Sequence, residues 1–171
     1  GKEAVGDKLL VQPSGQAATV KEILTFDGPL QQAVAGQSIT LTLNEHVDIS
    51  RGDVLAPSAQ PATLLKQVKA EVCWMADEPL DVRRKYWIKH GTRQTMAKVK
   101  AIESILDVNT QTRRAVDNPS EGLKLNDIAL IELTVQQPLA ADAYDAIRAT
   151  GAFILIDEVT HQTVAAGMIR I

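Results

Sequence analysis

The sequence has 171 residues, of which 45% are hydrophobic and 23% are charged, a composition typical of a globular protein with one large or two small cores. The formal net charge is −3 and the pI is about 5.6, so there is no overall positive field that would attract nucleic acid or an anionic membrane. The single cysteine, Cys73, excludes an internal disulfide and a cysteine-rich zinc site.

The chain shows no targeting or membrane-spanning segment. Residues 1–8 are charged and lack the apolar stretch of a secretory signal peptide. The longest apolar runs, such as 153–156, are far shorter than the roughly 20 residues that a membrane-spanning helix needs. We therefore expect a soluble protein, and the single cysteine favours a reducing, cytoplasmic location.

Short strands separated by turns fill the first third of the chain. Residues 8–12 and 19–26 are predicted strands, and each is followed by a turn rich in Pro, Gly, Ser or Asp. Residues 38–43 form the clearest strand, because apolar and hydroxyl side chains alternate along them. The tripeptide Arg51-Gly52-Asp53 is ordinary turn chemistry and not an adhesion motif. Turns this frequent favour a small β-barrel.

A change of composition marks a boundary near residue 56. Residues 56–63 are small, polar or proline, and they cannot fill a core. We predict that they join two modules, residues 1–56 and residues 57–171, and that they are the most protease-sensitive internal segment.

The second module contains two ambiguous segments. Residues 64–75 and 96–106 fit an apolar helical stripe as well as a strand, and periodicity leaves both possibilities open. Residues 140–150 are predicted to hold one short helical turn, and residues 117–122 to form a polar loop. The segments that favour strands are 86–88, 128–135, 153–157 and 164–171.

The motifs that bind nucleotides are absent from the sequence. It contains no Gly-x-x-x-x-Gly-Lys-[Ser/Thr] phosphate loop, no dinucleotide fingerprint, and neither Asp-x-x-Gly nor [Asn/Thr]-Lys-x-Asp. We therefore expect this chain not to bind nucleotide.

The side chains that could carry chemistry are His46, His90, His161, Cys73 and the acidic pairs Asp77-Glu78 and Asp157-Glu158. The histidines lie too far apart in sequence to form a metal pair. Cys73 could act as a nucleophile only beside a His and an orienting group, and we favour a plain buried or half-buried thiol. Adjacent carboxylates on a strand point to opposite faces, so paired acid–base work is not expected of the acidic pairs. We predict no catalytic, cofactor-binding or metal-binding residue in this chain.

Residues 83–90 place five basic or potentially basic residues around Tyr86 and Trp87. Such interleaving can bind single-stranded nucleic acid. Because the net charge is negative, we favour a strand with a solvated basic face and an aromatic side chain partly in the core.

Several motifs resemble those of a known family. Val5-Gly6-Asp7, Pro13-Ser14-Gly15, Gly36 and residues 47–55 resemble the second, barrel-shaped domain of elongation-factor-Tu-like GTPases. Later motifs, in order, are similar to the third domain of the large, GTP-hydrolysing subunit of bacterial sulfate adenylyltransferase. They lie at residues 70–75, 86–91, 106–110, 125–128, 149–157 and 164–169.

The resemblance implies an all-β fold of two small antiparallel β-barrels, with strands at 64–75 and 96–106. It implies a parent subunit that pairs with a smaller adenylyl-transferring subunit to make adenosine 5′-phosphosulfate from ATP and sulfate. GTP and Mg²⁺ would bind in an N-terminal domain missing from this chain, which would itself be inactive and serve as a docking and regulatory part beside that domain. The alternatives are the tRNA-contacting barrels of a translational GTPase and an autonomous ligand-binding barrel.

The resemblance also implies that the first barrel is incomplete, because residues 1–7 match a turn that normally follows its opening strands. We then expect residues 8–12 to form an unpaired edge. We also expect the side chains of Val20, Ile23, Ile39 and Leu41 to be exposed. The first module should then be either completed by self-association with a neighbouring copy or less ordered than the second module.

Overall fold

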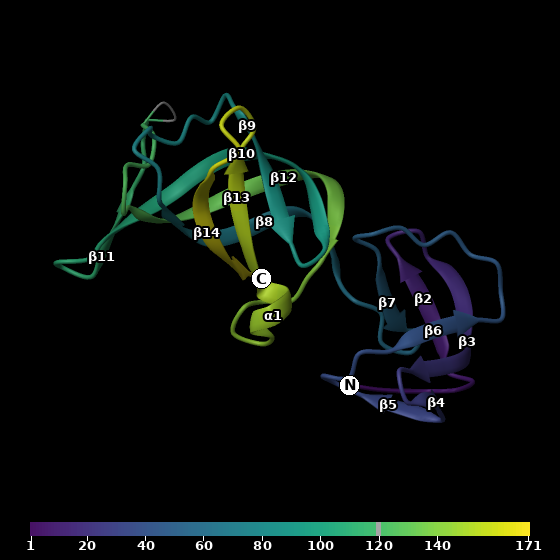
Figure 1. The fold of residues 1–171 in the computed structure, drawn as a ribbon. Coiled ribbons are helices and arrows are strands. Elements are labelled where there is room, and N and C mark those ends of the chain that lie inside the picture. The colour runs from purple at the N-terminus through teal and green to yellow at the C-terminus, as the bar shows by residue number, and fades with distance from the viewer. Residues whose placement is uncertain (119–120) are drawn as a thin grey trace. The chain divides into compact units, whose positions relative to one another are not determined.

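A computed structural model describes residues 1–118 and 121–171 of the chain, and almost all of its regular elements are strands (Figure 1). The described residues form two compact units, Gly1–Ala62 and Thr63–Ile171. The expected all-β fold is confirmed.

The first unit is an open sheet that curls into a half-barrel (Figure 1). Its main sheet has the strand order β4-β3-β2-β7, and β6 also pairs with β3, while β1 and β5 form a separate pair. The strands are β1 (Lys2–Ala4), β2 (Lys8–Gln12), β3 (Gln16–Thr25), β4 (Gly28–Leu30), β5 (Gln32–Val34), β6 (Thr40–Leu43) and β7 (Val54–Pro57). The expectation of an incomplete first barrel agrees with this open sheet.

The expected unpaired edge at residues 8–12 is wrong. Strand β2 pairs with β3 on one side and with β7 on the other, so its backbone groups are bonded along both edges. The expected exposure of the four apolar side chains is wrong as well. Val20 and Ile23 are 1% and 0% exposed and form a small core with Leu9 and Ala33, and the half-buried Ile39 and Leu41 pack against it. The last strand of the unit returns to cover β2, and this pairing removes the physical basis for self-association through that edge.

The segment after β7 is held against the first unit. Ala56 lies in β7 and is buried. The buried amide of Gln12 donates from Nε2 to the Ala62 carbonyl oxygen at 2.9 Å and accepts from the Ala62 N–H at 2.9 Å. The first unit therefore runs through Ala62, and residues 57–62, which the sequence analysis placed in the second module, pack with the first.

Gln12→Ala should release this segment. Both bonds to Ala62 are lost, and we expect faster hydrogen exchange and faster proteolysis across residues 58–62, with a loss of about 1 kcal/mol in stability. Hydrogen exchange followed by mass spectrometry measures this. Gln16→Ala, which removes an exposed glutamine at the start of β3, is the matched control. Unchanged protection in Gln12→Ala would show that the segment is held by other contacts.

The second unit is a closed six-stranded antiparallel barrel. Its strand order is β10-β12-β8-β14-β13-β9, and β9 pairs back with β10 to close the ring, while β11 extends one end of β10. The elements are β8 (Leu64–Trp74), β9 (Lys85–His90), β10 (Arg93–Asp107), β11 (Thr112–Ala115), β12 (Ile128–Ala140), α1 (Arg148–Gly151), β13 (Ala152–Asp157) and β14 (Thr163–Arg170).

The two ambiguous segments are both strands, as the resemblance implied. Along β8 the buried side chains Val68, Ala70, Val72 and Trp74 follow the period of two that a barrel wall requires. The predicted helical turn within 140–150 corresponds to α1. The predicted loop at 117–122 includes residues 119–120, which lie outside the described residues.

The barrel interior is filled by side chains. Trp74 packs edge-on against Tyr86 with ring centroids 5.7 Å apart, and its Nε1–H donates to the Glu78 carbonyl oxygen at 2.8 Å. Aliphatic side chains from all six strands complete this core. The outward-facing side chains and the loops therefore decide what the barrel can bind.

Candidate functional site

The candidate residues of the sequence analysis occupy structural positions. His90 is buried, and its Nε2 lies 2.6 Å from the Thr150 carbonyl oxygen, which ties β9 to α1. His46 and His161 are exposed, and Cys73 is half-buried on β8. Over the described residues, no group of three or more His, Cys, Asp and Glu side chains could hold a metal ion.

Asp157 organises the turn between β13 and β14. Its Oδ1 accepts the backbone N–H groups of Val159 and Thr160 at 2.7 and 3.0 Å, and its Oδ2 pairs with Arg84 Nη2 at 3.1 Å. The hydrogen bonds from these two N–H groups, together with the Arg84 charge, hold the pKa of Asp157 below its usual range. A carboxylate whose ionised form is favoured by these hydrogen bonds and by Arg84 locks a turn and is unsuited to proton transfer at neutral pH.

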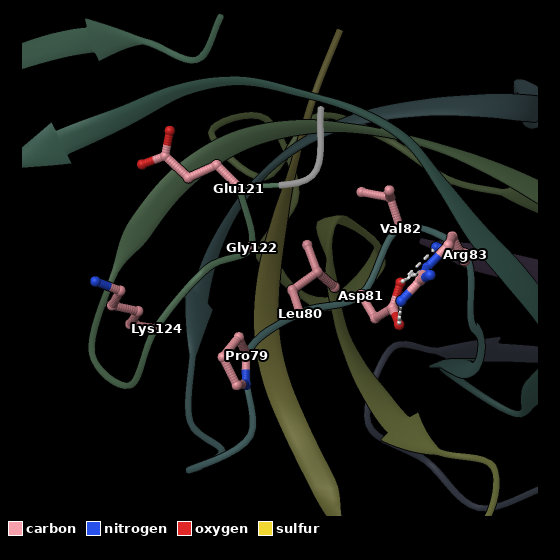
Figure 2. A pocket seen from close by; sticks show the side chains of 8 residues that line it. All are labelled: Pro79, Leu80, Asp81, Val82, Arg83, Glu121, Gly122 and Lys124. Atoms are coloured by element: carbon pink, nitrogen blue, oxygen red, sulfur yellow. Dashed lines mark hydrogen bonds and ion pairs between the residues drawn. The ribbon is translucent and has the colours of Figure 1, made fainter. Parts of the chain in front are cut away.

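Figure 2 shows a pocket formed by two loops of the second unit, residues 79–83 and residues 121–124, with a volume of about 750 Å³. Its two carboxylates are already paired with arginines. Asp81 faces Arg83, with Oδ1 3.1 Å from Nε, and Glu121 pairs with Arg114 at 2.7 Å. Hydrogen bonds from these arginines lower the pKa of both carboxyls. Among the residues described, the pocket therefore offers an apolar wall and no carboxyl group poised for acid–base catalysis.

An apolar face lies on the outside of β8, β14 and β13 and reaches the start of β12. The register aligns Cys73 with Ala166 and Ala166 with Ile154, and it pairs Met168 with Ala152. These five side chains, together with Ile128, line a hollow of about 660 Å³ and are called the apolar face below. Because the barrel core lies on the other side of the wall, outward apolar side chains gathered in this way indicate a protein interaction surface.

A second outer surface of the same barrel is basic. Lys85 of β9 and Lys98 and Lys100 of β10, with Lys66 of β8, line a groove of about 800 Å³, called the lysine groove below. Lys85 and Lys98 are direct cross-strand partners. Like charges in this position are unfavourable by a few tenths to about 1 kcal/mol, so folding alone does not explain the pair.

The basic segment 83–90 is divided between the two sides of the barrel wall. Tyr86, Ile88 and His90 are buried, whereas Lys85 and Lys89 are exposed. This is the strand with a solvated basic face that the sequence analysis favoured. Periodicity within residues 83–90 does not identify Lys98 as a neighbour of Lys85. The turn at Gly91, between two runs of strand-forming residues, was the signal that could have placed them opposite each other.

Comparison with known proteins identifies relatives along the whole chain. Residues 67–170 match the family model described as GTP-eEF1A C-terminal domain-like. The chain is 44% identical over 170 residues to sulfate adenylyltransferase subunit 1 of Shewanella woodyi and 42% identical over 170 residues to that of Citrobacter koseri. Each comparison covers 99% of this chain and 35% of the relative, so the chain spans about a third of these proteins.

Solved structures share the fold. A crystal structure of Sup35 complexed with GDP superposes with a TM-score of 0.85 at 20% identity, covering 99% of this chain and 41% of Sup35. The resemblance to sulfate adenylyltransferase that the motifs indicated is confirmed by the named relatives. The closed barrel and the family match over residues 67–170 together give the assignment: this chain belongs to the GTP-eEF1A C-terminal domain-like family.

Proposed function

We propose that this chain is the C-terminal docking and regulatory part of the GTPase subunit of a sulfate adenylyltransferase. Relatives that are 41–44% identical along nearly the whole chain carry the name subunit 1 of that enzyme, and a protein with this name works beside at least one other subunit. The parent enzyme would form adenosine 5′-phosphosulfate from ATP and sulfate in the cytoplasm and couple this step to GTP hydrolysis.

In this proposal the chain supplies contacts and no chemistry. Its sequence has no phosphate- or guanine-binding element, so GTP and Mg²⁺ would be bound by a domain of the parent outside this chain. A small adenylyl-transferring subunit would be the partner. The chain would transmit the nucleotide state of the GTPase domain to that subunit through a change in contacts.

The apolar face is the observation that supports docking most directly. Ile154 and Met168 stand on the outer wall of a barrel whose interior is already filled, where they add nothing to the core. Covering apolar surface is favourable by about 25 cal/mol per Å². A protein surface laid on β8, β14 and β13 would gain this free energy on binding.

Ala166→Glu tests the docking role. Ala166 is exposed at the centre of the apolar face, so the substitution should leave the barrel folded and place a charge inside the contact. We expect the wild-type chain to bind the small subunit in calorimetry, and Ala166→Glu to weaken binding at least tenfold, on the order expected for a charge buried without a partner.

Ala146→Glu adds the same charge at an exposed alanine that does not line the apolar face, and it should bind as wild type does. Absence of binding by the wild-type chain would contradict the docking proposal. Binding of tRNA that falls steeply with salt would instead favour the alternative, the barrels of a translational GTPase.

A further inference from the structure

We propose that the lysine groove, Lys66, Lys85, Lys98 and Lys100, is a second contact surface that binds an acidic segment of the partner subunit. The proposal rests on the docking function above and assigns the chemistry of one surface. It predicts that the partner presents Asp or Glu side chains on an extended segment that follows β9 and β10.

The first support is the lack of internal partners for these cations. Several other basic side chains of the second unit are paired: Arg114 with Glu121 at 2.7 Å, Arg170 with Glu71 at 3.0 Å, and Lys69 with Glu103 at 3.2 Å. In the groove, Lys100 has only a long contact of 3.6 Å to Glu132. Among the residues described, no carboxylate lies within 4.0 Å of the ammonium groups of Lys66, Lys85 or Lys98.

The second support is the way charge is distributed in this unit. Residues 63–171 contain fourteen Lys and Arg residues and fourteen Asp and Glu residues, so the net charge of the unit is zero. The groove is therefore a local concentration of positive charge in a neutral barrel. The register places Lys85 and Lys98 directly opposite each other on neighbouring strands, and an acidic side chain between them would relieve their repulsion.

The lining of the groove favours a peptide segment over nucleic acid. Val82 and Met96 also line the groove, and they offer apolar surface to the aliphatic side chains of an acidic segment. The groove is lined by no aromatic ring within the described chain, and single-stranded nucleic acid is held largely by stacking on such rings. Trp87 lies on the same strand but does not line the groove.

The double variant Lys85→Glu, Lys98→Glu tests the surface without altering the repulsion across the strands, because one like-charge pair replaces another. We expect binding of the small subunit to weaken at least tenfold at low salt, and the remaining affinity to depend less on ionic strength. The double variant Lys21→Glu, Lys124→Glu changes the net charge equally at exposed positions outside the groove and should bind within threefold of wild type.

The single variant Lys85→Glu separates binding from folding. It places Glu opposite Lys98, and such a pair stabilises a sheet. We therefore expect a higher melting temperature together with weaker binding. Weaker binding without loss of stability supports the proposal, whereas tighter or equal binding overturns it.

A second probe is independent of the partner subunit. A labelled ten-residue peptide of alternating Glu and Leu should bind the wild-type chain saturably and lose binding in the groove variant. Normal subunit binding by the groove variant overturns this inference and leaves the docking proposal standing. A different result would be that the wild-type chain binds the peptide but not the subunit, and that the groove variant loses peptide binding. This result overturns the docking proposal and supports an acidic ligand for the groove. Absence of both kinds of binding, or tighter binding of single-stranded RNA than of the peptide, overturns the inference.

Discussion

Gly167→Ala should destabilise the second unit by about 1–3 kcal/mol, and the same substitution should be nearly harmless in a chain that already carries Phe153→Ala. Gly167 and Phe153 are direct cross-strand partners on β14 and β13. A Cβ added at Gly167 would overlap the ring of Phe153, and this ring is 4% exposed in the barrel core. The glycine is required here for space.

Phe153→Ala alone should cost about 3–5 kcal/mol, because it empties a buried site that the closed barrel cannot fill by collapse. In the double variant the new methyl group at Gly167 occupies part of the space that the ring leaves. The effects should therefore not be additive, with a coupling energy of about 1–3 kcal/mol. Urea unfolding of the wild type, both single variants and the double variant measures this. Additive effects would show that the ring moves aside freely.

The contact between Gly167 and Phe153 joins two strands and cannot be read from either strand alone. For the same reason, sequence patterns predict strands better than they predict which strands pair. Residues 38–43 and 153–157 were identified as strands because they are apolar or alternate locally. Residues 64–75 remained ambiguous, since apolar positions spaced for a strand also fell at helical spacing. The resemblance implied a strand, and the pairing of β8 with β12 and β14 shows the physical reason. This pairing joins segments far apart in the chain.

The wrong prediction at residues 8–12 has the same origin. Strand β7, about 40 residues later in the sequence, pairs with β2 and covers its edge. Nothing within residues 8–12 signals this partner. Likewise, no local pattern places Lys66 near Lys85 and Lys98, although each lysine could be read as exposed. The sequence thus predicts the fold class and many strands. It does not predict the apolar face or the lysine groove, because the pairing register between distant strands decides which side chains gather there.

Asp157→Ala should lower the stability of the second unit by about 2–4 kcal/mol at pH 7, because two backbone N–H groups and Arg84 lose a common acceptor. Asp157→Asn should cost less, about 1 kcal/mol, since its side-chain oxygen can still accept from the Val159 and Thr160 N–H groups. The difference between wild type and Asp157→Asn isolates the negative charge of this carboxyl.

This difference should depend on pH in one direction. Backbone hydrogen bonds to Thr160 and Val159, and the nearby Arg84, lower the pKa of Asp157 in the folded protein, while an unfolded Asp titrates near about 3.9. The folded state therefore binds a proton less readily than the unfolded state. The stabilisation is complete above about pH 5 and is lost as the pH falls through the lowered folded pKa.

Thermal unfolding of wild type and Asp157→Asn from pH 7 to pH 3 measures this dependence. We expect the difference in free energy of unfolding between wild type and Asp157→Asn to be constant above about pH 5 and to narrow below about pH 4. Glu158→Gln changes the exposed neighbouring carboxylate. Its free energy of unfolding should match that of wild type across this pH range. A gap that stays constant down to pH 3 would mean that the Asp157 charge does not stabilise the fold, and that its role is confined to the two neutral hydrogen bonds that close the turn between β13 and β14.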